Sequence, residues 1–468
     1  MTPPPACSRL LAFTTFLLVV ASATGSASEP KRAPNIILIL ADDLGWADLA
    51  CYGNLYHETP RIDQLAREGM RWTNFYAGPV CSPTRTNIQS GRDQARYGIT
   101  QHIPGHRRPF AQLIDPVVPT ELPLEVETIA ERLADAGYAT GYFGKWHLGG
   151  AGFSPSEQGW QEVLEHSGHT YPRKPAPGET VQRTATVLTE RAIDFIDRHR
   201  TEPFLLQVSH FAVHIPLTVR PDLLSKYESK TPPSGSGFIN PAYAALLEEL
   251  DESVGAIVDA VDAAGLGEHT LILFVSDNGG IEYDQSGKQI TSNAPLRGEK
   301  GTLYEGGIRV PAIFRWRSVV PPASICETPA MTIDCFPTFA ELAQASRETE
   351  ILDGVSLAPL LHDPSALLDR TDLHWHLPHY HHGTPASALR RGDWKLIQLF
   401  ETNQHELYNL HDDPGESRNL IVSESEQAKV LQAALTKWQK EVGARMPVPN
   451  SNFDPARAKE LAKGGKGE

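Results

Sequence analysis

Two continuous apolar runs, far apart in the chain, constrain the fold more than any other feature of the sequence. Residues 35–41 read NIILILA and residues 271–275 read LILFV. A strand with apolar side chains on both faces belongs in the interior of a parallel sheet that helices cover on both sides. We therefore predict an α/β fold with a large, mostly parallel sheet sandwiched by helices.

Strand and helix patterns alternate from Asn35 to about Ala343. The expected strands span residues 35–41, 138–143, 204–209, 271–276 and 308–314. The expected helices span residues 60–68, 128–136, 185–199, 241–264 and 333–342. Thr128 and Glu131 are expected to form a capping box at the start of the second of these helices. This alternation indicates an α/β sandwich.

The pattern changes beyond Leu352. Short stretches at residues 374–377, 388–399 and 406–410 are separated by turn residues, and a helical stretch follows at 427–442. They predict a smaller subdomain with a short antiparallel sheet and a helix. The divisions that we expect are a signal peptide at 1–28, the main α/β domain at 29–350, an α+β subdomain at 351–447 and an extended tail at 448–468.

Both apolar runs end in a pair of oxygen-bearing side chains. Asp42 and Asp43 follow the first run, and Asp277 and Asn278 follow the second. Open α/β folds place ligands at the carboxyl edge of the sheet, so we predict one cation site there. Carboxylate and amide oxygens suit a hard cation such as Ca²⁺, and the lack of adjacent His or Cys argues against zinc. The alternative is two strand-end turns, in which Asp, Asn and Gly are common.

A third segment, residues 81–92, reads CSPTRTNIQSGR. Pro83 suits the first turn of a helix, and Ser82 is expected to cap it. The N-terminus of that helix would point backbone N–H groups at residue 81 and favour a bound oxyanion. The alternative for a lone cysteine is a buried structural role, since free Cys is among the most buried residue types.

Three glycine- or histidine-containing segments follow or flank the predicted strands. They are GKWHLG at 144–149, HFAVHIP at 210–216 and LRGEKGTLYEGGIRVP at 296–311. Each offers Lys or His side chains that could hold an anion or transfer a proton. The alternative is that they are solvated loops, which are often rich in glycine.

Taken together, the C-x-P-x-R pattern at Cys81, the later Ser-Gly-Arg, the two acid pairs and these segments resemble the type I sulfatases of the alkaline phosphatase superfamily. The resemblance extends over nearly the whole chain after the signal peptide. It implies that Cys81 is oxidised to formylglycine (3-oxoalanine) by a formylglycine-generating enzyme or a radical maturase. It also implies one Ca²⁺, held by the residues Asp42, Asp43, Cys81, Asp277 and Asn278.

The resemblance further implies roles for the remaining site residues. Lys145 and Lys300 would hold the sulfate, and His147 would act on a hydroxyl of the formylglycine hydrate. His214, with Lys300, would protonate the leaving alcohol. Arg85 would orient residue 81 and balance its charge, and Asp277 would take the proton of the attacking hydroxyl. We expect His210 to be a packing or supporting histidine.

The expected activity is release of inorganic sulfate from a sulfated small molecule or saccharide. The alternatives are a phosphonate or phosphate ester hydrolase of the same superfamily and a non-catalytic binding relative. Residues 374–382 read HWHLPHYHH, and we predict that His379 and Tyr380 contact the sugar next to the sulfate. The same run could instead be an exposed turn or a His-rich metal tract.

Charge and targeting signals narrow the partners. The formal net charge of −15 argues against nucleic acid and anionic membrane surfaces, so local cations such as Lys145 must capture an anionic substrate. An apolar core at 10–21 predicts a signal peptide, and no other stretch is long enough to cross a membrane. Without an Asn-x-Ser/Thr sequon, export by a bacterium to the periplasm or medium fits best. We expect no disulfide, and the oligomeric state stays open.

Overall fold

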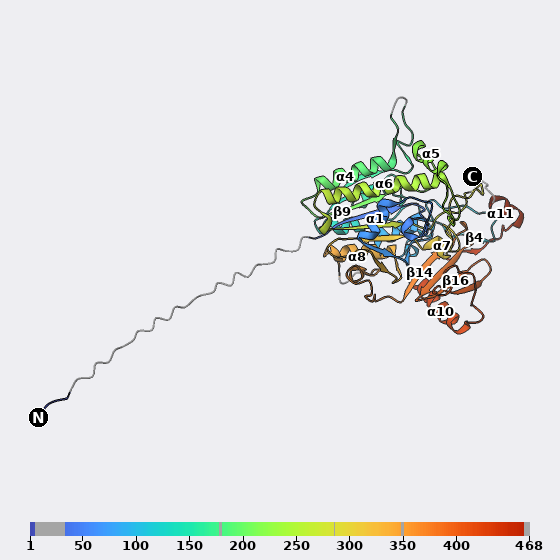
Figure 1. Ribbon diagram of the computed structural model, residues 1–468. Helices are drawn as coiled ribbons and strands as arrows, with labels where there is room; N and C mark the ends of the chain where they lie inside the picture. The colour runs from blue at the N-terminus through green and yellow to red at the C-terminus, as the bar shows by residue number, and fades with distance from the viewer. Residues whose placement is uncertain (5–32, 177–179, 285, 348–350, 463–468) are drawn as a thin grey trace. The chain divides into compact units, whose positions relative to one another are not determined.

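An eight-stranded sheet forms the centre of the fold, in the order β12-β2-β11-β10-β1-β9-β5-β6 (Figure 1). The strands span Ser324–Cys326 (β12), Met70–Trp72 (β2), Ala312–Arg315 (β11), Thr270–Ser276 (β10), Asn35–Ala41 (β1), Phe204–Ser209 (β9), Ala139–Gly144 (β5) and Glu162–Glu165 (β6). The computed structural model describes residues 1–4, 33–176, 180–284, 286–347 and 351–462. From Ala33 onward the chain is one compact unit.

The sheet is mostly parallel, as the apolar runs predict. β1 lies at its centre and runs parallel to β10 on one side and β9 on the other. β5 and β6 continue the parallel order, whereas β11 pairs antiparallel with both β10 and β2. Every residue of β1 and β10 is buried, which explains why these strands contain no alternating polar face.

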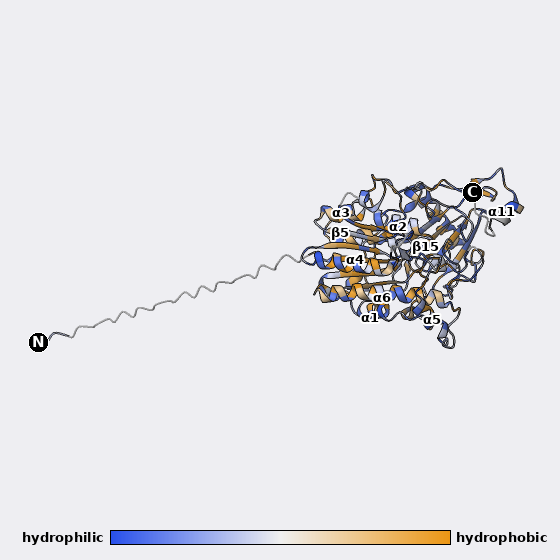
Figure 2. Cartoon of the chain, turned by 90° about the horizontal axis from the view of Figure 1, so that it is seen from above, coloured by the Kyte–Doolittle hydropathy of each residue, from blue (hydrophilic) through white to orange (hydrophobic). Residues whose placement is uncertain are grey.

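Successive residues of β1 point to opposite faces of the sheet, and each face is covered by helices. Ile36, Leu38 and Leu40 pack in one apolar core, whereas Ile37 and Ile39 pack in the other. Helices α2 (Cys81–Ser90), α3 (Ile129–Asp135) and α8 (Cys335–Leu342) contribute to the first core, and α1 (Pro60–Glu68), α4 (Thr184–Arg198) and α6 (Pro241–Ala263) to the second. Figure 2 shows the apolar strands lying between helices whose outer faces are polar.

The boundaries of most expected elements agree with the structure to within one or two residues, but one strand is shorter than expected. Residues 308–314 do not form a continuous strand, because α7 (Glu305–Ile308) precedes β11. Gly306 and Gly307 allow this helical turn, since a side chain at either position would overlap a nearby backbone carbonyl. The capping box between Thr128 and Glu131 at the start of α3 is confirmed.

The C-terminal part of the chain forms a second, smaller sheet of four antiparallel strands, in the order β14-β15-β16-β17. Its strands span Asp372–Leu377 (β14), Ala386–Arg391 (β15), Trp394–Leu399 (β16) and Gln404–Asn409 (β17). The expected single stretch at 388–399 is thus two strands. Arg391 pairs with Trp394 across a two-residue turn in which Gly392 adopts a φ of 57°, a conformation that glycine favours.

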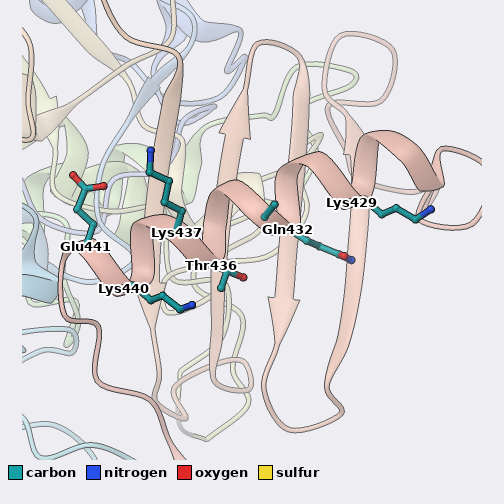
Figure 3. A pocket seen from close by; sticks show the side chains of 7 residues that line it. Lys429, Gln432, Thr436, Lys437, Lys440 and Glu441 are labelled. Carbon is teal, nitrogen blue, oxygen red and sulfur yellow. The ribbon is translucent and has the colours of Figure 1, made fainter.

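Helix α10 (Ser425–Glu441) covers one face of this small sheet. Leu431, Leu435 and Trp438 pack against strand residues such as Leu396. The opposite side of the helix carries polar and charged side chains, among them Lys429, Lys437 and Lys440 (Figure 3). An apolar stripe on the sheet side and lysines on the outer side are what an amphipathic helix on a sheet requires.

The other face of the small sheet packs against the main sheet's connecting segments. Trp375 of β14 lies beside Tyr76 with their ring centroids 5.3 Å apart, and its indole N–H donates to the Ala77 carbonyl at 2.9 Å. Ile308 and Ile333 complete this apolar contact. The small sheet therefore packs against the start of the segment that leads from Tyr76 to Cys81.

The tail differs from our expectation. Val448–Pro449 (β18) pairs with Leu113–Ile114 (β4), and Pro455–Ala462 forms helix α11, so the described part of 448–468 is not simply extended. The predicted signal peptide at 1–28 falls almost entirely outside the described residues. Within the described chain, no helix is both long and apolar enough to cross a bilayer. The cysteines of that part, Cys51, Cys81, Cys326 and Cys335, are all free thiols.

A buried charge cluster joins helix α7 to the small sheet and generates a stability prediction. The Lys395 ammonium lies 2.9 Å from Glu305 and 2.8 Å from Glu416, and all three side chains are 0% exposed. Replacing Lys395 by Met leaves two buried carboxylates without their cation. We expect a loss of about 3–5 kcal/mol in the free energy of unfolding, measured by urea denaturation.

The matched control is Lys429→Met on the outer face of α10. Lys429 forms an exposed pair with Glu426, so its loss should change the unfolding free energy by less than about 1 kcal/mol. Similar effects of the two substitutions would contradict the assignment of the Lys395 cluster as a buried link.

Candidate active site

The two acid pairs meet because their strands are parallel neighbours in register. Ala41 at the end of β1 lies opposite Ser276 at the end of β10, so the residues that follow, Asp42 and Asp277, emerge side by side. The Asn278 amide donates to an oxygen of Asp43 at 2.8 Å. Asp43 has a φ of 66°, which turns the chain sharply at the strand end. All four side chains are fully buried.

Three of the buried oxygens in this group have no hydrogen-bond partner among the described residues. They are Asp42 Oδ1, Asp43 Oδ2 and Asn278 Oδ1. A buried oxygen without a donor costs free energy, so a native site with three of them needs another positive partner. Two carboxylate oxygens and one amide oxygen are the donor set of a hard divalent cation. These residues fit such an ion.

Three basic side chains neutralise the acids. Lys145 Nζ lies 2.5 Å from Asp42, Lys300 Nζ lies 2.6 Å from Asp43, and Arg85 Nη2 lies 2.8 Å from Asp277. Burial opposes ionisation of Asp42 and Asp43, but the neighbouring lysines hold the pKa of each carboxyl below its usual value.

Asp277 behaves differently from the other two acids. Its burial and the adjacent Asp42 raise its pKa to about 8, although Arg85 opposes this. Burial and repulsion from Asp42 thus outweigh the attraction of Arg85 for the charged form of Asp277. A divalent cation beside Asp42 would lower the pKa of Asp277 and keep it ionised.

Cys81 is the first residue of α2 and lies at the centre of these groups. Its Sγ is 3.1 Å from His147 Nδ1, and it lies within 4.8 Å of ligand oxygens of Asp42 and Asp277. The expected cap at Ser82 is wrong: Val80 occupies the N-cap position, and the Ser82 hydroxyl donates to the His147 carbonyl at 2.9 Å. Ser82 therefore ties the helix start to the His147 loop.

His147 is oriented for proton transfer at residue 81. Its Nε2 lies 2.8 Å from the Ile103 carbonyl, which can only accept a hydrogen bond, so Nε2 carries the hydrogen. Nδ1, facing Cys81, is then the basic nitrogen. Burial and the nearby Lys145 lower the pKa of His147 to about 4, so the ring is neutral at pH 7. A φ of 62° for this residue reflects the tight turn that aims the ring.

The two histidines of the 210–216 segment have different surroundings. His214 Nε2 lies 3.6 Å from Asp43, at the edge of the acid group. His210 is buried, and its Nε2 lies 3.2 Å from the Ser253 hydroxyl on helix α6. The contact of His210 with α6 is that of a packing histidine. Phe211 lies under Lys145, with Nζ 5.5 Å from the ring centroid, which favours the charged lysine.

Comparison with known proteins identifies the family. Residues 34–345 match the Sulfatase family, and residues 298–443 match the C-terminal region of N-sulphoglucosamine sulphohydrolase. The chain is 30% identical to a sulfatase of Formosa agariphila, over 92% of this chain and 91% of that protein. It is 32% identical to arylsulfatase A of Homo sapiens, over 86% of each. The crystal structure of Ps i-CgsB, at 26% identity, superposes with a TM-score of 0.75 and covers 93% of this chain and 98% of that one.

This chain belongs to the sulfatase family. It is accordingly an enzyme that hydrolyses sulfate esters, which removes the non-catalytic binding relative as an alternative. The acids, lysines and Cys81 lie together at the carboxyl edge of the sheet of this sulfatase, where α/β folds bind their ligands.

The structure places His379 and Tyr380 in a different setting from the acids and lysines. His379 is 1% exposed, and its ring lies 2.8 Å from the Thr100 hydroxyl and 3.8 Å from Asp115. The Tyr380 hydroxyl donates to Glu401 at 2.8 Å. These contacts fix the loop, and a role for the pair in sugar binding stays a prediction.

Sequence reasoning missed two residues beside the sulfatase site. Thr84, inside the C-x-P-x-R pattern, donates to the Asp277 carbonyl at 2.6 Å and accepts from the Gly78 N–H at 2.7 Å. His102 approaches His147 with 6.4 Å between ring centroids. For Thr84 the signal was its place in the motif, whereas His102 could be found only from the tertiary structure.

The unpartnered oxygens generate a prediction for cation binding. Ca²⁺ at about 100 times its dissociation constant should raise the unfolding free energy by about 2.7 kcal/mol relative to protein in EDTA. Asp42→Asn removes a charged ligand, and a roughly 100-fold weaker affinity would reduce this gain to about 0.4 kcal/mol. Urea unfolding with and without Ca²⁺ measures both.

Asp259→Asn is the control for this experiment, because Asp259 is an exposed acid that pairs with Arg61 and not with the buried acid group. Its Ca²⁺-dependent gain should equal that of the unaltered protein. An Asp42→Asn variant that retains the full gain would contradict the assignment of Asp42 as a ligand.

Proposed function

We propose that this sulfatase releases inorganic sulfate from a sulfated carbohydrate, using formylglycine made from Cys81 and one bound Ca²⁺. The observation that carries the proposal is the position of Cys81 Sγ, 3.1 Å from a basic His147 nitrogen and within 4.8 Å of the Asp42 and Asp277 oxygens. The C-x-P-x-R pattern that begins there supports the modification. A formylglycine-generating enzyme or radical maturase would supply the oxidant that converts the thiol to an aldehyde.

The proposed cation site consists of Asp42, Asp43, Asp277, Asn278 and residue 81. When bound, the cation would supply positive charge to the sulfate oxygens and to the oxygen of the attacking group. Ca²⁺ suits the site because it accepts mixed carboxylate and amide ligands with flexible geometry.

The first half-reaction needs a base and an acid. The hydrated aldehyde of residue 81 supplies two hydroxyl groups, and one of them attacks sulfur. Asp277 accepts the proton of that hydroxyl, while Arg85, 2.8 Å away, stabilises the carboxylate before transfer. As the bond between sulfur and the alcohol oxygen breaks, His214 and Lys300 provide the proton that the leaving alkoxide takes up.

The second half-reaction releases sulfate. His147 Nδ1 removes the proton of the remaining hydroxyl, the C–O bond to the sulfate group breaks, and the aldehyde forms again. The Ile103 carbonyl holds the ring in the tautomer that this step needs. Lys145 and Lys300, both nearly fully buried, hold the sulfate oxygens throughout.

A saccharide is the substrate that the comparisons favour. The crystal structure of Ps i-CgsB in complex with k-i-k-neocarrahexaose, at 26% identity, has a TM-score of 0.74 to this chain. That neighbour binds an oligosaccharide, which supports a carbohydrate as the alcohol here. We also propose export to the periplasm or medium, supported by the apolar segment at residues 10–21.

The modification has a direct test by mass spectrometry of the tryptic peptide Trp72–Arg85. We expect an aldehyde in place of the Cys81 thiol in active enzyme. Cys81→Ala should fold normally and lose about 1,000-fold or more of its turnover of p-nitrophenyl sulfate, because the nucleophile is gone. Cys51→Ala, which alters another free thiol, should retain activity. An unmodified thiol in fully active enzyme would overturn the proposal.

The choice of ester is tested by kcat/KM for p-nitrophenyl sulfate, p-nitrophenyl phosphate and phenylphosphonate. Three basic side chains face three carboxylates here, so the surplus positive charge is mainly that of the cation. The singly charged sulfate ester should therefore be preferred to the phosphate dianion. A preference for either phosphorus ester would support the alternative superfamily activity. If the sulfate ester is preferred, a panel of monosaccharide sulfates would identify the sugar.

A further inference from the structure

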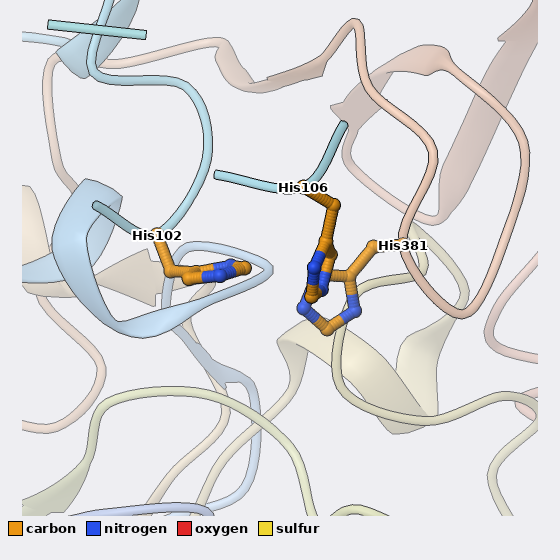
Figure 4. Close-up of side chains that lie close together, drawn as sticks. All are labelled: His102, His106 and His381. Carbon is orange, nitrogen blue, oxygen red and sulfur yellow. The ribbon is translucent and has the colours of Figure 1, made fainter. Parts of the chain in front are cut away.

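Three histidines from two loops face one another beside the acid and lysine group. His102 and His106 belong to the segment after Gly98, and His381 belongs to the loop after β14 (Figure 4). The ring centroids are 4.5 Å apart for His102 and His106, 5.0 Å for His106 and His381, and 5.4 Å for His102 and His381. The catalytic scheme above uses none of these rings.

The three rings offer nitrogens to one point. One nitrogen from each lies within 4.8 Å of the others, and all three residues are half-buried. His102 Nδ1 is a buried nitrogen that has no hydrogen-bond partner among the described residues. A buried ring nitrogen needs a hydrogen-bond partner or a cation, since it would otherwise be desolvated without compensation.

Burial disfavours the charged form of all three rings, and a metal ligand must be a neutral imidazole. Burial, followed by the neighbouring His106, lowers the pKa of His102 to about 2. Burial and Arg108 lower the pKa of His106 to about 4. Neutral imidazole is a ligand for borderline transition metals, in contrast to the carboxylate and amide oxygens around Asp42, which suit hard cations.

We propose that His102, His106 and His381 form a second cation site that binds a borderline divalent metal of the Zn²⁺ class through three imidazole nitrogens. The ligand nitrogens of a tetrahedral Zn²⁺ are about 3.4 Å apart, so modest rotation of these half-buried rings closes the site. His382 supports the arrangement, because its Nδ1 lies 2.8 Å from His381 Nδ1. A partner of this kind orients a metal-binding ring.

The site would adjoin the proposed sulfate pocket. The His102 ring centroid lies 6.4 Å from that of His147. On the other side, His381 lies against Gly301, where an added Cβ would overlap its ring, and Gly301 follows Lys300. Three protein ligands leave a fourth position open to water or to an oxygen of the substrate. Only this last role rests on the proposed function.

Titration of untagged, Ca²⁺-loaded protein with Co²⁺ tests the site, since Co²⁺ in a tetrahedral nitrogen site absorbs visible light and Ca²⁺ does not. We expect a visible band that saturates with a single Co²⁺ and is lost when Zn²⁺ displaces it. His106→Ala and His381→Ala should each weaken Co²⁺ binding by about 100-fold or more, because each removes a ligand. His199→Ala is the matched control, since His199 pairs with surface acids Glu162 and Glu202.

Two histidine variants are included so that misfolding of one leaves the other informative, with far-UV circular dichroism as the check. Absence of a saturable Co²⁺ band in the unaltered protein would overturn the proposal. So would a band of equal affinity in both ligand variants, or its loss in His199→Ala. The titration measures metal binding and not catalysis. Its result therefore stands whether or not the protein hydrolyses sulfate esters, and the two proposals can fail separately.

Discussion

The parallel pairing of β1 with β10 is the constraint on which the site depends. The two strands end in register, so their following residues bring Asp42, Asp43 and Asp277 into one fully buried group. Buried carboxylates are costly unless they are paired with positive charge. Lys145 and Lys300, which come from distant parts of the chain, supply this charge by pairing with Asp42 and Asp43. The loops that carry the two lysines are therefore held beside the buried acids.

The same requirement explains why the C-terminal sheet is part of the catalytic architecture. Lys300 lies just before α7, whose first residue, Glu305, forms a buried ion pair with Lys395 of β16. Glu416 accepts the Glu305 backbone N–H at 2.7 Å and also faces Lys395. The small sheet thus holds in place the segment that carries Lys300 next to Asp43. It does so through the fully buried ion pairs of Lys395 with Glu305 and Glu416.

Sequence reasoning was most successful where one local signal decided the structure. Continuous apolar runs predicted β1 and β10, and the capping residues predicted the start of α3. It failed where packing chose between local possibilities. Residues 308–314 were expected to be one strand, but a helical turn ends at Ile308, and glycine at 306 and 307 leaves room for nearby backbone carbonyls there. Ser82 looked like a helix cap, yet its hydroxyl donates to the distant His147 carbonyl.

By itself the sequence determined which chemical groups are available: an unusual cysteine motif, two acid pairs at strand ends, and lysines and histidines after strands. Patterns of this kind are local, because side-chain chemistry and strand burial depend on a few adjacent residues. Only the tertiary structure decided which acid pairs with which lysine, that His379 turns to Thr100, and that His102, His106 and His381 face one another. Those contacts join loops separated by hundreds of residues, and no local pattern sets the distance between such loops.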